Sequence, residues 1–255
     1  MQKACGWLSA LSIPDKDVES HILRIFALAV SGASDAKVRA CGKRMPEFAW
    51  QEYGGDPVPV IIAHLALKRA STEHSSLTQL ARTYRSILLD SPEVPRLLGR
   101  LLSILSETPS SSNARVCLPE LGSLVRATRA EIVEICRIAL LESAAGTISV
   151  ASEGSEFLPA LALSYARDWD LQTCCALLRT SAYLRVNHLQ ERHWAVEWLL
   201  DQQISDGSFG LLRPEAAYRG AATVDWHDYF DRTIHAVWAL SDLRAGSGMA
   251  LFLGI

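Results

Sequence analysis

The chain consists almost entirely of short runs in which apolar side chains recur with the period of an α-helix. After the acidic segment 15–17, Ile22, Ile25, Phe26 and Val30 lie three or four residues apart. Comparable runs follow, each ended by polar residues, Pro or Gly, and they cover residues 58–69, 77–89, 94–105, 120–128, 130–142, 158–167, 170–184, 190–203 and 230–243. Strand-like alternation is hard to find. The sequence therefore predicts an all-α fold of about ten short helices joined by short loops, the pattern of stacked or ring-closed α-hairpins.

Length and composition favour one domain with a large core. The chain has 255 residues, of which 49% are hydrophobic. A soft boundary is expected at residues 146–155, and residues 106–113 are a second candidate linker, so a two-lobed helical protein is an alternative. Residues 211–224 are long for a helix connection, and loops of that length often cover an active site.

Charge and cysteine usage narrow the class of protein. A net charge of −3 with scattered Arg residues disfavours a nucleic-acid partner. The six cysteines show no disulfide spacing, and two of them, Cys136 and Cys174, lie within apolar helical patterns as buried thiols do. Polar residues interrupt the N-terminal segment and no apolar run approaches the length of a membrane span, so we expect neither a signal peptide nor a transmembrane helix. We expect a soluble protein of the reducing cytoplasm.

The segment 194–210 joins an amphipathic helix to a distinctive turn. Trp194, Trp198 and Leu199 lie on one helix face. Gln202 and Gln203 follow in the last turn, where side-chain amides can bond the carbonyl groups left unpaired at a helix C-terminus. Asp206 and Gly207 then supply residues that tolerate positive φ. The segment predicts a helix that ends in a tightly bonded turn.

The richest chemistry lies in residues 224–243. A helix that begins near Asp228 places Asp228, Asp231, His235 and Trp238 on one side, and His227 is also four residues from Asp231. A carboxylate one turn from an imidazole can orient it and raise its pKa toward neutrality, which suits a general acid or base. We therefore predict Asp231, His235, Asp228 and His227 as catalytic residues. The alternative is that the aspartates cap the helix while His235 is a satisfied core side chain.

A weak internal repeat extends this site. Residues 170–178 can be laid over residues 231–239, which matches Asp170 with Asp231 and Cys174 with His235. Asp170 is otherwise explained as a helix N-cap with acidic neighbours. The candidate substrate-binding residues from the two segments are Trp238, Trp226, Tyr229, Asp170, Cys174, Arg179 and Tyr183. Histidines 64, 74, 188 and 193 have no acid partner at a suitable spacing and are interpreted as structural. The N-terminal half offers no chemistry to name.

The Gln/aromatic segment resembles a motif of the terpenoid cyclase and protein prenyltransferase superfamily. Residues 224–243 also resemble its inner helices, in which a polar residue near the helix start and a Thr-x-x-Ala/Cys-x-x-Leu core face a central cavity. The resemblance is specific over residues 168–243. More narrowly, the chain is similar to an actinobacterial family of helical proteins found near natural-product biosynthesis genes. The segments that carry this likeness are residues 168–171, 178–184, 200–210 and 233–240. The resemblance implies an α/α toroid or partial toroid of about ten to twelve short paired helices.

Departures from that superfamily limit what the resemblance implies. The chain has no Asp-x-Asp-Asp, no Asp-Asp-x-x-Asp and no Cys-His-Gly, so terpene protonation, diphosphate ionisation and the lanthionine-cyclase zinc site are not supported. Zinc held by Cys174, Asp231 and His235 is a minor alternative, as is a catalytic thiolate at Cys174 or Cys175. No dinucleotide, Walker, serine-hydrolase or metalloprotease motif is present. We expect no cofactor and no metal.

These observations predict a natural-product tailoring enzyme, a cofactor-free cyclase. Its apolar, aromatic-lined cavity would fold a peptide-derived or other biosynthetic intermediate while Asp231 and His235 move a proton during ring closure. The alternative is a non-catalytic helical partner that binds a leader peptide or a biosynthetic enzyme. The expected partners are accordingly a small-molecule or peptide substrate and other biosynthetic enzymes.

Overall fold

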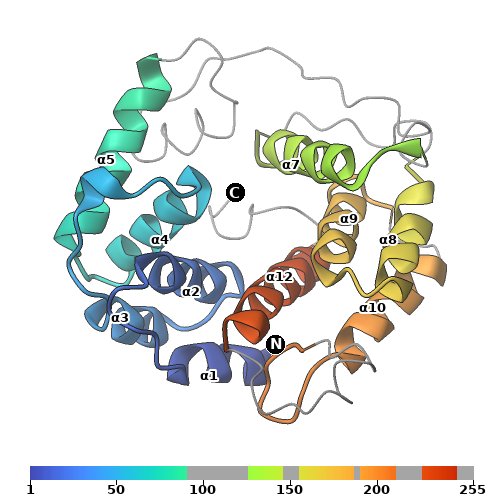
Figure 1. The fold of residues 1–255 in the computed structure, drawn as a ribbon, viewed down its shortest axis with the longest axis horizontal. Coiled ribbons are helices and arrows are strands. Elements are labelled where there is room, and N and C mark those ends of the chain that lie inside the picture. The colour runs from blue at the N-terminus through green and yellow to red at the C-terminus, as the bar shows by residue number, and fades with distance from the viewer. Residues whose placement is uncertain (91–125, 146–154, 187–189, 211–225, 246–255) are drawn as a thin grey trace. The chain divides into compact units, whose positions relative to one another are not determined.

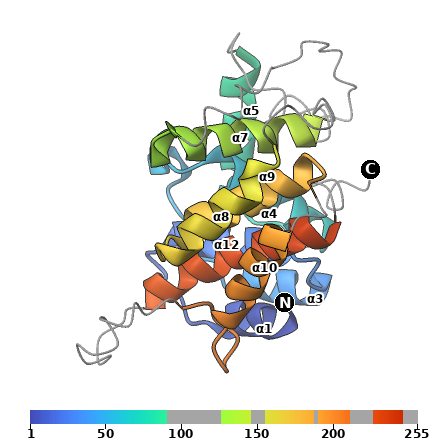
Figure 2. The ribbon, with the colours of Figure 1, turned by 90° about the vertical axis from the view of Figure 1, so that its right-hand side faces the viewer.

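A computed structural model describes residues 1–90, 126–145, 155–186, 190–210 and 226–245, and in these ranges the fold is all-α (Figures 1 and 2). The described residues form no strand beyond an isolated antiparallel bridge between Gln203 and Phe209. The predicted fold class is therefore confirmed. Closure of the helices into an α/α toroid stays a prediction.

The chain divides into two compact units, which we describe separately. Unit 1 comprises Met1–Trp7 and Arg115–Ile255, and unit 2 comprises Leu8–Ala114. One division falls inside helix α1 (Gln2–Ala10). The soft boundary expected at residues 146–155, the candidate linker at 106–113 and the covering loop at 211–224 lie essentially outside the described residues.

Unit 2 is organised around helix α4 (Pro57–Arg69), which packs against α2 (Val18–Val30), α3 (Asp35–Lys43) and α5 (Ser75–Asp90). A short 3₁₀ helix, η1 (Trp50–Glu52), lies beside α5. Asp17 caps α2 through the Ser20 amide, and Asp56 caps α4 through the Val58 amide.

Close helix contact in unit 2 depends on a glycine. A Cβ atom at Gly42 of α3 would lie 2.4 Å from Cδ2 of Leu67 on α4.

The buried core includes Ile22, Ile25 and Phe26 of α2, three of the four residues whose spacing predicts that helix.

Unit 1 is organised around helix α9 (Leu171–Tyr183), in which every residue except Gln172 is buried. It contacts α7 (Arg129–Ala145), α8 (Phe157–Arg167), α10 (Gln190–Asp201) and α12 (Trp226–Ala245). A helix surrounded in this way is apolar on all sides, which explains the nearly continuous small and apolar sequence of α9.

The turn after α10 has the glutamine bond to a helix carbonyl that its sequence predicts at Gln202, whereas Gln203 bonds within the turn. Gln202 donates its side-chain amide to the carbonyl of Trp198 (3.1 Å), and Gln203 donates to the carbonyl of Gly207 (3.1 Å). Gly207 has φ +104°, and a Cβ atom there would lie 2.5 Å from the Lys3 backbone. Only glycine fits both conditions.

The turn also anchors the start of α12. The buried amide of Phe209 donates to Oγ1 of Thr233 (2.8 Å), and Thr233 donates in turn to the carbonyl of Tyr229 (2.6 Å). The ring of Phe209 is fully buried. The turn and α12 therefore pack as one body, which fixes the helix that carries the predicted catalytic residues.

The other helix predictions are largely confirmed, with differences at the ends. The predicted runs 58–69, 77–89, 130–142, 158–167 and 170–184 match α4, α5, α7, α8 and α9 to within a few residues. Helices α1 and α3 were not expected, and α12 begins at Trp226, earlier than its predicted start. The runs 94–105 and 120–128 lie essentially outside the described residues.

Two further expectations concern the cysteines and the membrane. Cys136 and Cys174 are buried, as predicted, and the described cysteines are free thiols. Among the described helices, none is both long and apolar enough to span a membrane.

Candidate functional site

The N-cap of α9 fixes a carboxylate at the edge of unit 1. Asp170 accepts the amide of Thr173 on Oδ1 (3.1 Å) and its hydroxyl on Oδ2 (2.8 Å). The predicted N-cap is therefore confirmed. The preceding residue, Trp169, has φ +63° and turns the chain sharply between α8 and α9.

Arg129, at the start of α7, holds the same carboxylate in two places. Its Nε donates to Oδ2 of Asp170, and its Nη2 donates to Oδ1 (3.3 Å). Burial opposes ionisation of Asp170, but the bonds from Arg129 and Thr173 outweigh it and lower the pKa of the carboxyl group. Asp170 is thus an ionised, immobilised carboxylate.

Asp170 lies beside a cavity that the predicted residues of α12 also line. The cavity has a volume of about 300 Å³, and its lining residues are Trp169, Asp170, Leu171, Gln172, Asp231, Arg232 and His235. The structure therefore brings together two carboxylates and one imidazole from two helices. The lining is mostly polar, so the expectation of an apolar, aromatic cavity is wrong for this cavity.

His235 behaves differently from the prediction. Burial, followed by the positive charge of Arg179, lowers the pKa of His235 from 6.5 to about 4. The acidic residue that acts in the opposite direction is Asp170 of α9, not Asp231 of the same helix. The predicted rise of the pKa toward neutrality is wrong, because spacing along one helix reveals neither burial nor the charge on the neighbouring helix.

Arg179 lies next to His235 with its charge unpaired by any acid among the described residues. Its guanidinium carbon lies 3.7 Å from the ring centroid of Trp238, one turn along α12 from His235. The Nε and Nη1 atoms are buried and have no hydrogen-bond partner in the described structure. The face of an indole ring stabilises such a cation, which explains how it is tolerated inside the unit.

The cysteines of α9 are packing residues. Cys174 and Cys175 are fully buried, and burial raises the pKa of both thiols, that of Cys175 to about 12. A thiolate at either position is disfavoured. Among the described residues no group of three His, Cys, Asp or Glu side chains is placed to hold a metal ion, so Cys174, Asp231 and His235 do not form a ligand set.

Tyr183 ends α9 in a buried polar pair. Its hydroxyl donates to Oδ2 of Asp242 on α12, and both side chains are buried. Burial and the neighbouring carboxylate raise the pKa of Tyr183. Neither Tyr183, Cys174, Arg179 nor Trp238 lines the cavity of Asp170 and His235.

The first turns of α12 hold the remaining predicted residues. Trp226 stacks on His227 with ring centroids 3.7 Å apart and meets Phe230 edge-on at 5.5 Å. His227 is exposed, and Tyr229 lies against Gly210, where a Cβ atom would be 2.2 Å from its ring. The side chain of Asp228 lies outside the described residues. A catalytic pair of His227 and Asp231 stays a prediction.

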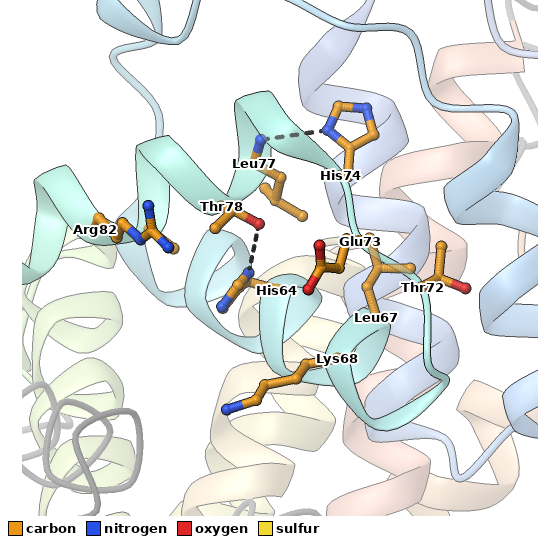
Figure 3. Close-up of a pocket in the computed structure, with 10 residues that line it drawn as sticks. His64, Leu67, Lys68, Thr72, Glu73, His74, Leu77, Thr78 and Arg82 are labelled. Carbon is orange, nitrogen blue, oxygen red and sulfur yellow. Dashed lines mark hydrogen bonds between the residues drawn. The ribbon is translucent and has the colours of Figure 1, made fainter.

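Sequence reasoning missed a second cavity, of about 300 Å³, in unit 2 (Figure 3). It lies between α4 and α5, and its lining includes His64, Lys68, Glu73, Thr78 and Arg82. These residues come from two helices and the turn between them. No local spacing in the sequence signals the cluster, and His64 alone looks like an ordinary helix residue.

No family model, curated protein or solved structure matches the chain. The described residues thus define an all-α protein whose unit 1 carries a polar cavity with two carboxylates and an uncharged imidazole.

Proposed function

We propose that the protein is a natural-product tailoring enzyme, a cofactor-free cyclase that closes a ring in a peptide-derived or other biosynthetic intermediate. The observation that carries the proposal is the single cavity that Asp170, Asp231 and His235 share. Groups that can accept and return a proton, held on two rigid helices around one space, are what acid/base ring closure needs. The resemblance to the α/α-toroid cyclases supports the same class.

The chemistry requires no external reactant. A substrate N–H or O–H adds to an electrophilic carbon, and His235, which is uncharged at neutral pH, takes the proton as the new bond forms. The imidazolium then returns that proton to the carbon or oxygen that received the electron pair. The product is an isomer of the substrate, so all atoms and electrons balance.

Arg179 favours the second proton transfer, in which the imidazolium of His235 returns its proton. Because burial and the nearby guanidinium destabilise the imidazolium, His235 is a weak base but its protonated form is a strong acid. The ionised Asp170 opposes Arg179 and makes the first proton transfer possible. Asp231, whose side chain is exposed, lines the same cavity from α12, and its proposed role is to orient a polar substrate group.

The size of the cavity limits the reacting part of the substrate. About 300 Å³ is at the lower end of small-molecule sites, so this open cavity accommodates a ring-forming segment rather than a whole peptide. Confining that segment removes conformational freedom that otherwise opposes ring closure.

The test introduces His235→Gln or Asp231→Asn into the gene in its native host. The metabolites of each variant strain are compared with those of the unmodified strain by chromatography and mass spectrometry. We expect a linear isomer of unchanged mass to accumulate and the cyclic product to fall by about 10²-fold or more. His193→Gln and Asp201→Asn change exposed residues of unit 1 and serve as matched controls. Normal product from the first two variants would refute catalysis.

The alternative, a non-catalytic partner of a leader peptide or a biosynthetic enzyme, has one observation in its favour. Trp194, Leu200 and Ile204 of α10 and its turn are large apolar side chains with 36–46% of their surface exposed. Such side chains favour docking of another protein. In that case Leu200→Ser would abolish product, whereas His235→Gln would leave it unchanged.

A further inference from the structure

The second cavity gathers charged side chains that make no ion pairs. In unit 2, Lys68 follows His64 by one turn of α4, Arg82 lies on α5, and Glu73 belongs to the turn between the helices. None of Lys68, Glu73 and Arg82 forms a salt bridge within the described part of the chain. In Figure 3, Arg82 lies to the left of His64, Lys68 lies below it and Glu73 lies to its right.

The walls of the cavity are fixed by hydrogen bonds that do not involve these cations. The Nε2 atom of His74 lies 3.2 Å from the carbonyl oxygen of Met45 and 3.1 Å from that of Pro46. Its Nδ1 atom accepts a hydrogen bond from the amide of Leu77. Glu47 accepts the amide of Ser76 (3.0 Å), which caps the start of α5. The cavity is therefore a feature of the folded unit, and His74 is part of its frame.

His64 experiences the positive field of the cluster. Burial, followed by the charges of Lys68 and Arg82, lowers the pKa of His64, and Glu73 acts weakly in the opposite direction. Its only hydrogen-bonding neighbour in the described structure is the hydroxyl of Thr78, at 3.5 Å from Nδ1. The lowered pKa favours the uncharged imidazole, and a negative charge in the cavity would raise that pKa again.

We propose that this cavity is a binding site for a small oxyanion, the phosphoryl or carboxylate group of a ligand, held between the ammonium group of Lys68 and the guanidinium group of Arg82. Neither cation forms a salt bridge within the described residues, although Glu73 also lines the cavity and Arg82 donates to Oε1 of Gln79 (3.4 Å). The space accommodates a small ligand. His64 and Thr78 line the same space and supply further donors. Binding is accompanied by proton uptake at His64. The site is separate from the proposed cyclase cavity, which lies in the other unit.

A metal ion is not the expected occupant. Among the described residues, no three His, Cys, Asp or Glu side chains are placed to bind a metal ion. The positive charges of Lys68 and Arg82 also repel a metal cation. An anion is favoured by the same charges.

The experiment is calorimetric titration of the full-length protein with inorganic phosphate and, in a second arm, with succinate, at constant ionic strength. Each titration is repeated in two buffers with different ionisation enthalpies, which reveals proton uptake. We expect a single site. Because phosphate itself takes up a proton near neutral pH, proton uptake by the protein is read from the succinate arm, in which the affinity should increase as pH is lowered. Preference for phosphate or for succinate distinguishes a phosphoryl from a carboxylate ligand.

Matched variants localise the binding. Lys68→Gln and Arg82→Gln should each weaken it by about tenfold or more, because each removes a charge-assisted hydrogen bond. His64→Gln should abolish proton uptake, whereas Lys43→Gln, which removes an exposed charge of α3, should change nothing. Absence of binding by both anions, or equal binding by the Lys68 and Lys43 variants, would overturn the proposal. His235→Gln should bind phosphate normally, so the outcome is independent of the cyclase test.

Discussion

Tyr183 shows how a single residue stabilises the contact between α9 and α12. Its buried hydroxyl donates to the buried carboxylate of Asp242. Tyr183→Phe removes the donor but keeps the ring, so we expect the free energy of unfolding to fall by about 1–3 kcal/mol. Urea denaturation measures the change. Tyr165→Phe on α8, where the described structure shows no hydroxyl bond, is the control and should have almost no effect.

His235 makes the stability of the protein depend on pH in a defined window. The unfolded chain takes a proton at this residue near pH 6.5, whereas the folded chain resists protonation to about pH 4. Between these values the unfolded state binds more protons, so the free energy of unfolding decreases as pH falls through the window. His235→Gln should remove this part of the pH dependence, as measured by urea denaturation at several pH values.

Arg179 provides the control for this pH effect. Arg179→Met removes the positive charge beside His235, so the pKa of His235 in the folded protein should rise. The pH range over which His235 lowers stability should therefore become narrower. The titration of His235, followed by nuclear magnetic resonance of its ring carbon, reports this directly. A midpoint near 6.5 in the unmodified protein would contradict the burial of this imidazole.

At the scale of the element, the turn after α10 has a glycine that no other residue can replace. Gly207→Ala adds a methyl group against the Lys3 backbone at a positive φ. We expect a loss of about 2–4 kcal/mol in the free energy of unfolding. Gly6→Ala in α1 is the matched control, because its Cβ atom meets nothing within 4 Å and should stabilise the helix by up to about 1 kcal/mol. Equal effects in thermal denaturation would show that the turn is not rigid.

Elements with a regular apolar period could be predicted from the sequence, and those without one could not. Helix α2 follows from the spacing of its buried Ile and Phe residues, and α9 follows from its run of mostly small and apolar residues. Helices α1 and α3 are short, and in α3 only Val38, Cys41 and Gly42 are buried, so their patterns are too weak to recognise.

The candidate site was predictable only where its residues share one helix. The four-residue spacing of Asp231 and His235 predicts that they share one helix face, and both line the same cavity. The N-cap pattern predicts the position of Asp170 at the start of α9. Contacts between helices left no local signal: neither the bond from Arg129 to Asp170 nor the charge of Arg179 beside His235 could be inferred. The direction of the His235 pKa was therefore predicted incorrectly.

At the scale of the whole molecule, the division into two compact units predicts separate responses to core substitutions. Phe26 in unit 2 and Phe230 in unit 1 are both fully buried. Each Phe→Ala substitution leaves a cavity and should lower the free energy of unfolding of the unit that contains it by about 3–5 kcal/mol. Because contacts are dense within each unit, the loss should remain local to that unit.

Amide hydrogen exchange followed by mass spectrometry tests this separation. Phe26→Ala should accelerate exchange in α2, α4 and α5 while the amides of α8, α9 and α12 keep their protection, and Phe230→Ala should do the reverse. If either substitution accelerates exchange equally in both units, the chain unfolds as one cooperative body and the expectation of a single domain gains support. Local responses would instead mean that the oxyanion cavity and the acid/base cavity can be altered independently by mutation.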